Sequence, residues 1–580
     1  MLACVRFRTF LSLSLLLAGA CRSASHREAQ PAPEASTAIW VDAAWEGPGD
    51  GSRDRPLRSL GEALARPGPL TVRLAPGRYT GPFVLPPGAR LEGQGQGVIL
   101  LAEDASHTVL RVSGSGSMSG LVVQGGQWGL EVTGGGHVRL ERVGFSGQQT
   151  GAVRVEAGRL DVEGGRFDAA PTATVGVLLE SADTLASDRG AQVVGAERRS
   201  TAPSAPVTSP SVGADERRKA ESGAGAAGAS AGGPREGAGH LEGAVSPADA
   251  EGPREGAGHL MGEASPAEGL EHPQAGGEAH IRDSTFTGPY RRAVRLRGAK
   301  MRARLEGVRF SGPATAVGVD GAHAEVLRSS AEGGQAAAFS VMSGTLILDE
   351  VTVTGHEYAV SAMQAVLLDV HRFTTVRAIR AGMGVSLSRA RLRDIVVRES
   401  GAYGGLQFLG GDQDVQGVRV EGASEYGLMA LRGKLRLRDA DIRGVHTADG
   451  VTGDALHLRQ VEADVEGVVV RDAQGACVLA AQDARVSLRG AKLESCGDVG
   501  LMTDTLARMD ASNVKIQGAA RALKAHGGSE LRVDSLDAQG LEKGFVQAEC
   551  EGDTQVHLKD LRSEDLRGLS AAPCVQVISR

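Results

Sequence analysis

Two aspartates and one arginine have the spacing of a cation-binding or acid–base site. Asp349 and Asp369 take the same outward position in successive copies of a repeated motif, and Arg393 takes it in the next copy. If the copies stack as paired strands, the two carboxylates lie about 5 Å apart and repel each other. Either one of them then holds a proton, or both share a cation such as Ca²⁺. The alternative is a surface acid pair that is neutralised by Arg393 and other basic neighbours.

A second set of candidates lies in one long connection, DADIRGVHTADGVTGDALHL (439–458). Carboxylates and imidazoles bind metals and exchange protons, and long loops have functional roles more often than regular elements do. We take Asp454 and His457 as candidate catalytic residues, and the same stretch contains Asp441, His446 and Asp449. The alternative is an ordinary turn rich in Gly, Asp and His.

The elements that would position these residues are short strands that recur with a period near 22 residues. The segments VRLERVGF (138–145), LDVEGGRF (160–167) and LILDEVTV (346–353) share one alternating apolar pattern. No copy can bury its apolar face alone, whereas stacked copies pair about 4.8 Å apart around a continuous core. The sequence therefore predicts an all-β fold, a single right-handed parallel β-helix solenoid of roughly 19 coils.

Composition agrees with a repeat fold and excludes some partners. The 580 residues include 82 Gly and only 3% aromatic residues, without a collagen period, which indicates a tightly turning backbone. The net charge of −7, from 63 basic and 70 acidic residues, excludes a basic nucleic-acid footprint. It also provides no single-sign field that would steer a charged partner.

Residues 41–95 resemble the N-terminal region of pectate-lyase-like β-helix proteins. They carry DG (50–51), RP (55–56), SL (59–60), AL (63–64) and PGRY (76–79) in the order of that family. In the family, a short helix covers the first coil and hides its unpaired backbone. The resemblance implies such a capping helix over residues 57–65, with Leu60 and Leu64 facing the open end of the core.

Many proteins of this fold are polysaccharide lyases or hydrolases, although a fold does not imply a function. Pectate lyases use Ca²⁺-binding carboxylates and a basic proton acceptor, which is the enzymatic interpretation of Asp349, Asp369 and Arg393. The polygalacturonase motifs NTD, DD, GHG and RIK are absent, as is the WiDH run of pectate lyases. Nothing resembles a zinc spacing, a P-loop or a nucleophile elbow.

Two columns of outward residues alternate in charge. The first runs from Arg139 through Asp161 to His557, and the second from Glu141 to Lys559. A site for an acidic polymer would show a basic stripe, and a site for a neutral sugar would show aromatic platforms. Neither occurs in these two columns, whose mixed signs favour cross-strand pairing and solubility.

The first twenty residues have the three parts of a secretory signal peptide. Arg6 and Arg8 form the basic region, residues 10–17 the apolar region, and Ala18-Gly19-Ala20 the cleavage site. The run LLLAGAC resembles the lipobox of bacterial lipoproteins, which implies acylation of Cys21 and a tether over 21–37. Arg22 is not the acidic residue of the family's inner-membrane retention signal, which favours the outer membrane. The alternative is ordinary signal cleavage, with Cys21 incidental.

A low-complexity insertion interrupts the repeats at 195–278, between solenoid segments 38–194 and 279–580. It is rich in Gly, Ala, Ser, Pro, Glu and Arg, so the sequence predicts disorder. The segment GPREGAGHL occurs at 233–241 and again at 252–260. The copies, with His240 and His259 in equivalent places, are either a slippage duplication or a binding repeat.

Four cysteines follow Cys21. Cys550 and Cys574 each lie six residues after a glycine in successive coils, so the same column and a disulfide are expected. Two stacked thiols are the alternative. Cys477 and Cys496 fall in different columns, which makes a bridge between them doubtful.

These observations favour an exported, membrane-anchored β-helix lipoprotein of the bacterial cell envelope, at the outer membrane or cell surface. Its role would be non-catalytic, in adhesion, scaffolding or glycan contact. The expected partners are the membrane, through the lipid, and a polysaccharide or an envelope protein, with no nucleic acid and no cofactor. The alternative is a polysaccharide lyase or hydrolase, with which calcium would enter. A periplasmic accessory factor for metal-enzyme maturation ranks last, because few Met and His residues cluster outward.

Overall fold

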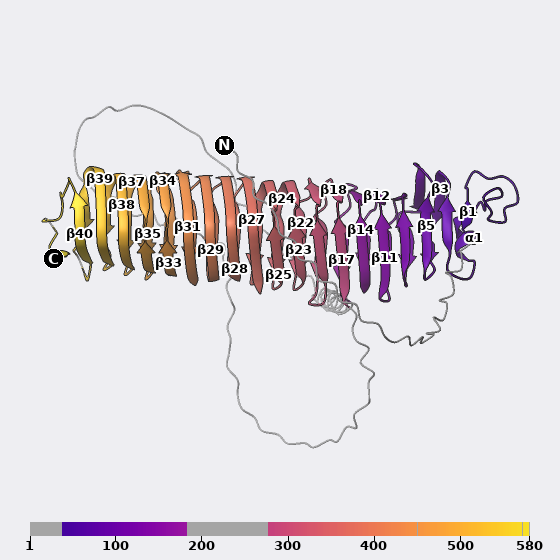
Figure 1. Cartoon of the computed structure of the whole chain (residues 1–580), viewed down its shortest axis with the longest axis horizontal. Helices are drawn as coiled ribbons and strands as arrows, with labels where there is room; N and C mark the ends of the chain where they lie inside the picture. The colour runs from indigo at the N-terminus through magenta and orange to yellow at the C-terminus, as the bar shows by residue number, and fades with distance from the viewer. Residues whose placement is uncertain (1–37, 182–275, 449, 551, 571, 579–580) are drawn as a thin grey trace, which may run out of the picture. The chain divides into compact units, whose positions relative to one another are not determined.

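The chain folds as a parallel β-solenoid (Figure 1). The computed structural model describes residues 38–181 and 276–578, apart from 449, 551 and 571. This part of the chain makes about 18 turns, with parallel strand pairs and almost no helix. The all-β parallel solenoid predicted from the repeats is therefore confirmed.

Each turn passes through three faces. The strands confined to the first face are β1 (Ile39–Val41), β2 (Thr71–Leu74), β5 (Ala89–Gly93), β8 (Gly116–Ser119), β11 (Gly136–Glu141), β14 (Gly158–Glu163), β17 (Gly277–Arg282), β20 (Arg302–Glu306), β23 (His323–Leu327), β25 (Thr345–Asp349), β33 (Glu462–Glu466), β36 (Arg485–Arg489) and β41 (Val575–Ile578). Those confined to the second face are β3 (Gly77–Gly81), β6 (Val98–Ala102), β9 (Val122–Gln124), β12 (Gly144–Ser146), β15 (Arg166–Asp168), β18 (Thr285–Thr287), β21 (Arg309–Ser311) and β34 (Val469–Ala473).

Those confined to the third face are β4 (Phe83–Leu85), β7 (Leu110–Val112), β10 (Trp128–Val132), β13 (Gly151–Val155), β16 (Val175–Glu180), β19 (Arg292–Arg297), β22 (Thr315–Asp320), β30 (Tyr426–Leu431), β32 (Asp454–Arg459) and β35 (Ala476–Ala481). Longer strands bend around a corner from one face into the next: β24 (Ser330–Met342), β26 (Thr352–Met363), β27 (Leu367–Ala378), β28 (Ala381–Ser400), β29 (Leu406–Ala423), β31 (Lys434–Val445), β37 (Lys492–Asp504), β38 (Arg508–Ala525), β39 (Glu530–Ala548) and β40 (Gln555–Ser563).

The corner between the first and second faces is one residue in the left-handed backbone region. This residue separates the two apolar pairs of the repeated pattern. Its left-handed backbone conformation favours Gly, Asp and Asn. Its successive occupants include Arg142, Gly164, Asp283, Gly307, Arg328, Glu350, Arg372, Asp394, Gly417, Asp439, Gly467, Gly490, Asn513, Ser535 and Asp560. The high glycine content of the sequence is partly explained by this column.

Inward side chains of the three faces form one continuous core. On the second face, phenylalanine rings stack along the axis, with centroids 5.3 Å apart for Phe145 and Phe167, 4.4 Å for Phe167 and Phe286, and 5.2 Å for Phe286 and Phe310. Phe167 and Phe286 lie in paired strands β15 and β18 on the two sides of residues 182–275. The core therefore continues from one solenoid segment into the other.

The N-terminal end of the core is covered by α1 (Leu60–Leu64). Ser59 caps this helix by accepting the backbone N–H of Glu62 at 3.3 Å, and Leu60 and Leu64 are buried. The helix is shorter than the predicted span of 57–65, because Leu57 instead pairs with Val41 as an isolated strand bridge. Within the described ranges, no helix is both long and apolar enough to span a membrane.

Several predicted segments lie outside the described residues. These are the signal peptide, Cys21 and its tether, and nearly all of the insertion predicted at 195–278. The solenoid resumes slightly before the predicted end of the insertion at 278, because β17 begins at Gly277 and pairs with β14 from its first residue.

Candidate functional site

The register of the first face separates the two aspartates predicted to share one column. Asp349 is in register with His371, whereas Asp369 is in register with Ile347 on one side and Arg391 on the other. The expectation that Asp349 and Asp369 are successive members of one column is therefore wrong. Asp369 belongs to the first outward column of this face, and Asp349 belongs to the second.

The cause is a two-residue slip in aligning one coil. Val366 and Leu367 look like the start of the apolar pattern, but Val366 is 67% exposed at a corner of the solenoid. The repeated pattern of this coil ends at Thr375, a polar residue that is only 1% exposed. The same slip affects the coil that contains Asp510, which is in register with Ser487.

Each of the three predicted residues has its own partner. The Asp349 carboxylate lies 2.6 Å from Arg372 Nη2, and Asp369 Oδ1 lies 3.0 Å from His371 Nε2. Arg393 Nη2 donates to Asp414 Oδ2 at 2.6 Å. Across residues 38–181 and 276–578, no group of three or more His, Cys, Asp and Glu side chains is arranged to hold a metal ion.

Ion pairs of this kind recur along the outward columns of the first face. Around a small surface cavity of about 140 Å³, Asp161 accepts from Arg159 Nε at 3.0 Å and lies 2.6 Å from His137 Nε2. Burial would raise the pKa of Asp161, but these hydrogen bonds outweigh burial and lower it. The Asp161 carboxylate in this cavity is therefore engaged with two basic neighbours.

The second predicted set is brought together in part. His457 Nδ1 lies 2.7 Å from Asp454 Oδ2, and the other oxygen of Asp454 accepts the Ala476 N–H at 2.7 Å. The ring of Tyr426, in the preceding coil, meets the imidazole edge-on with centroids 4.9 Å apart. Asp454 and His457 are each 7% exposed, and Nε2 of His457 has no hydrogen-bond partner among the described residues. This oriented imidazole with a free nitrogen could accept a proton or bind a ligand.

The other members of that set lie apart from this pair. Asp441 is bound by Arg443 and by Arg471 Nη1 at 2.8 Å. Burial would raise the pKa of Asp441, but these two guanidinium groups outweigh burial and lower it. His446 Nε2 lies 3.2 Å from Ser424 Oγ, and Asp449 lies outside the described residues.

A surface that the sequence analysis missed lies on the third face. In five consecutive coils, none of the three outward columns contains a charged side chain. We call these fifteen positions the uncharged window. They are Ala337, Ser340 and Met342; Tyr358, Ser361 and Met363; Ala381, Gly384 and Ser386; Gly404, Gln407 and Leu409; and Tyr426, Met429 and Leu431. Ala381 and Gly404 are buried, so the other thirteen positions form the accessible surface.

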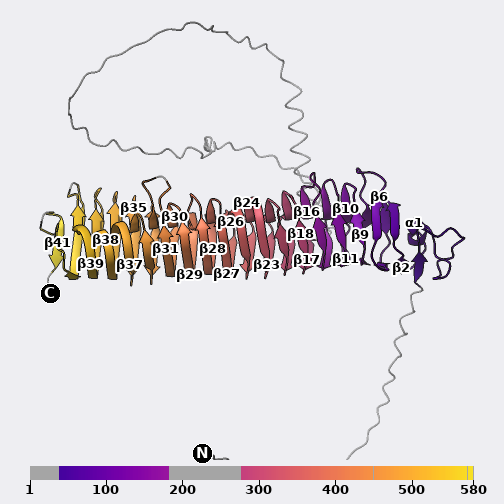
Figure 2. The same ribbon diagram turned by 90° about the horizontal axis from the view of Figure 1, so that it is seen from above.

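Charged and titratable residues border the window at both ends of the same columns. Arg297 and Asp320 precede Met342, and Asp454, His457 and Arg459 follow the last coil. The strands that hold the window, including β24, β26, β28 and β30, lie side by side in the middle of the solenoid (Figure 2). His457 thus adjoins the window at its C-terminal end, directly in register with Met429.

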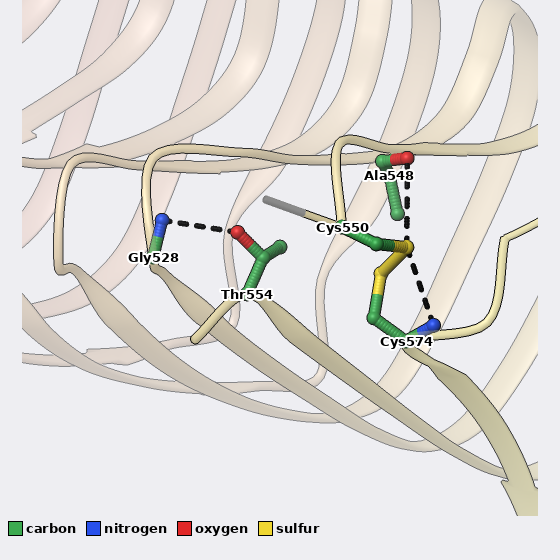
Figure 3. Close-up of a disulfide and its surroundings, with 5 residues drawn as sticks. All are labelled: Gly528, Ala548, Cys550, Thr554 and Cys574. Atoms are coloured by element: carbon green, nitrogen blue, oxygen red, sulfur yellow. Dashed lines mark hydrogen bonds between the residues drawn. A yellow bond between two sulfur atoms is a disulfide. The ribbon is translucent and has the colours of Figure 1, made fainter. Parts of the chain in front are cut away.

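Both pairs of the remaining cysteines form disulfides. Cys550 and Cys574, one coil apart, have Cα atoms 5.4 Å apart, and the Cys574 N–H donates to Cys550 Sγ at 3.2 Å (Figure 3). Cys477 and Cys496 are also bridged, with Cα atoms 5.5 Å apart, so the doubt about their pairing was wrong. Cys496 is in register with Ala473, and Cys477 lies just beyond the corner at 474–475 of that same coil. This bridge therefore crosses a corner and does not join two members of one column.

Comparisons with known proteins give no family. No family model and no curated protein matches this sequence. Among solved structures, the catalytic unit of a GH87 alpha-1,3-glucanase from Streptomyces thermodiastaticus is 10% identical with a TM-score of 0.24, covering 90% of this chain and 69% of that one. A PL6 family alginate lyase is 10% identical with a TM-score of 0.27, covering 90% and 84%. The A-module of a mannuronan C-5 epimerase from Azotobacter vinelandii is 9% identical with a TM-score of 0.18, covering 86% and 91%. At these identities and TM-scores, the likeness says nothing about the chemistry of this chain.

Proposed function

We propose that this protein is a non-catalytic, glycan-contacting β-solenoid, exported and held at a bacterial membrane by a lipid on Cys21. The observation that supports a non-catalytic role is the separation of Asp349, Asp369 and Arg393, the first of the two predicted sets. Asp349 pairs with Arg372, Arg393 pairs with Asp414, and Asp369 lies beside His371 in another column, so the three do not converge on one point where a substrate atom could react.

The solenoid is suited to presenting a long surface. Its ladder of parallel strands spaces equivalent outward side chains about 4.8 Å apart, so one row can contact a polymer at several places. The signal peptide and the lipobox-like run before Cys21 support display at an envelope membrane, with the outer membrane favoured by Arg22.

Two measurements test this proposal. Expressed in a Gram-negative host that has a lipoprotein pathway, the full chain should incorporate labelled palmitate and partition with the outer membrane, and Cys21→Ser should abolish both. Purified protein should also release no reducing ends and no unsaturated products from a panel of neutral and acidic polysaccharides. Soluble, unlabelled wild type, or turnover above a heat-denatured control, would contradict the proposal.

A second candidate function is a polysaccharide-active enzyme, and the Asp454–His457 pair favours it. The carboxylate orients the imidazole and leaves Nε2 free, as a general base requires, although that atom is buried in this structure. Turnover of any polysaccharide in the same panel that disappears in both Asp454→Asn and His457→Ala would establish this role. Turnover that persists in both variants would exclude the pair as its source.

A further inference from the structure

The uncharged window differs from the rest of the outward surface in charge and in side-chain chemistry. In the columns of the first face, opposite charges alternate and pair with each other, as for Arg304 and Glu325 at the surface. In the window, hydroxyl, amide, aromatic and thioether groups replace them over five coils. At about 4.8 Å per coil, this surface extends roughly 20 Å along the axis.

The polar side chains at the centre of the window are free to bind. Ser340, Ser361 and Gln407 occupy the central column and form no side-chain hydrogen bond with the residues that the structure describes. Serines elsewhere are used in the fold: Ser329 Oγ, for example, accepts the Val308 N–H at 3.1 Å and donates to Leu327 O at 2.7 Å. The window therefore presents hydroxyl and amide groups whose hydrogen-bonding capacity a ligand can use.

Aromatic rings lie along one side of this column. The ring of Tyr358 approaches Gly384 of the next coil so closely that a Cβ there would lie 3.3 Å from Cε1. The ring therefore packs against a position that has no side chain. Burial raises the pKa of Tyr358 and outweighs the opposing effect of the neighbouring Arg380 guanidinium. Tyr403 is 37% exposed at the adjacent corner, where the Arg380 guanidinium lies 5.9 Å from the centre of its ring. That guanidinium is itself paired with Glu357 at 3.3 Å.

Apolar side chains lie along the other side. Met342 and Met363 are in register, and each is 50% exposed. At the corner beyond them, Leu387 is 64% exposed. Exposed thioether and aliphatic groups opposite aromatic rings, with hydroxyl groups between them, make a surface that has both apolar contacts and directional polar groups.

We propose that the uncharged window binds a neutral polysaccharide chain that runs along the solenoid axis. Sugar rings have apolar C–H faces, which fit tyrosine rings and methionine side chains, and hydroxyl groups, which fit Ser340, Ser361 and Gln407. The window's own positions carry no cation, and Arg380, which adjoins Tyr358, is already paired with Glu357 at 3.3 Å, so an anionic polymer would gain little to replace its hydration. This inference rests on the proposed glycan-contact function and deepens it by naming the surface and the class of glycan.

Affinity electrophoresis of the full chain carrying Cys21→Ser tests the inference. The probes are laminarin, dextran, xylan and galactomannan as neutral polysaccharides, and polygalacturonate and alginate as anionic ones. We expect at least one neutral polysaccharide to retard migration at both low and high salt, because an uncharged contact is not screened. Retardation by none of the four, or only by an anionic polymer and only at low salt, would overturn the inference.

Matched variants locate the binding surface. We expect the dissociation constant to rise at least tenfold in the double variant Tyr358→Ala/Tyr403→Ala. We expect the same rise in the single variant Ser340→Asp. Ser117→Asp makes the same chemical change on the first face, between Arg90 and Arg139, and should leave binding unchanged. Melting temperatures within about two degrees of wild type would show that the variants are folded, and Ser361→Asp replaces any that is not. Equal binding by Ser340→Asp and Ser117→Asp would overturn the inference.

Sedimentation of the same samples separates a glycan from a second copy of the chain. A dimer that Ser340→Asp converts to a monomer would make the window a self-association surface and would overturn the inference. In either of these failures the anchored, non-catalytic solenoid still stands, because palmitate labelling and the absence of turnover test it independently.

Discussion

Asp454 and His457 form a buried hydrogen-bonded pair on the third face, with 2.7 Å between the carboxylate oxygen and the imidazole Nδ1. The second oxygen of Asp454 accepts the Ala476 N–H of the next coil. One carboxylate thus serves two donors, one on its own strand β32 and one on β35. Because both side chains are 7% exposed, water cannot readily replace either interaction.

Removing this carboxylate should therefore destabilise the protein. We expect Asp454→Ala to lower the free energy of unfolding by about 2–4 kcal/mol, since two buried donors lose their acceptor. Asp510→Ala, at a side chain that is 68% exposed, should cost less than about 0.5 kcal/mol. Urea unfolding followed by circular dichroism compares the two, and equal losses would show that the Asp454 interactions do not stabilise the fold.

The His526–Asp504 pair should make stability depend on pH. His526 Nδ1 donates a hydrogen bond to Asp504 Oδ1 at 3.1 Å, which raises the pKa of His526 and lowers the pKa of Asp504. The histidine contribution is complete below its unfolded value of 6.5 and is lost as pH rises through the raised folded value. The aspartate contribution is complete above 3.8 and is lost as pH falls through the lowered folded value.

We therefore expect the stability difference between wild type and His526→Gln to be largest between these two pH values. The difference should be below about 1 kcal/mol, because both groups are partly exposed, and should shrink above neutral pH. Thermal melts of both proteins across pH 4 to 9 measure it. A difference that grows toward alkaline pH has the wrong sign for a raised histidine pKa.

The corner-crossing disulfide should contribute substantially to stability. Cys477 and Cys496 are separated by 19 residues, and closing a loop of that size stabilises a fold by about 3 kcal/mol. We expect the double variant Cys477→Ala/Cys496→Ala to unfold at a clearly lower urea concentration than wild type in neutral buffer without reductant. Thiol titration in denaturant should detect no free thiol among the four solenoid cysteines of wild type. Two reactive thiols at Cys477 and Cys496 would rule out the bridge.

Calcium should have no effect through Asp349 and Asp369. The two carboxylates lie in different columns and are each paired with a basic neighbour. Melting after EDTA treatment and again with millimolar Ca²⁺ should give the same temperature, and Asp349→Asn should change stability by less than about 0.5 kcal/mol. A rise of several degrees with Ca²⁺ that is lost in Asp349→Ala/Asp369→Ala would restore the cation site, because a ligand stabilises the state that it binds.

The fold was predictable because its period is repeated many times. An error in one coil, such as the slip at Val366, leaves the architecture unchanged, since the neighbouring coils still indicate stacked strands. The candidate site was less predictable for the same reason. A slip of two residues keeps the apolar pattern nearly intact but moves Asp369 to another outward column, and the exposed Val366 and the buried Thr375 give no warning of it.

The uncharged window could not be found by comparing the two columns of the first face. Tyr358 and Tyr426 occupy the first outward column of the third face, three coils apart, and Tyr403 lies at a corner. The connections before these positions differ in length, so their alignment requires the strand register. Cys477 and Cys496 illustrate the same limit, because a bridge across a corner depends on how sharply the chain turns there.

The Cys550–Cys574 disulfide has a consequence for how the protein resists degradation. In a solenoid, each coil is held by its neighbours, so the terminal coils open most easily. At one end α1 covers the core, and at the other the disulfide ties the strand β41 region to the coil beneath it. While the bond is oxidised, the C-terminal coils are therefore protected from proteases that cleave only unfolded chain ends. Reduction would convert this slow, whole-molecule opening into stepwise peeling, and the lifetime of the protein would then depend on the redox state of its surroundings.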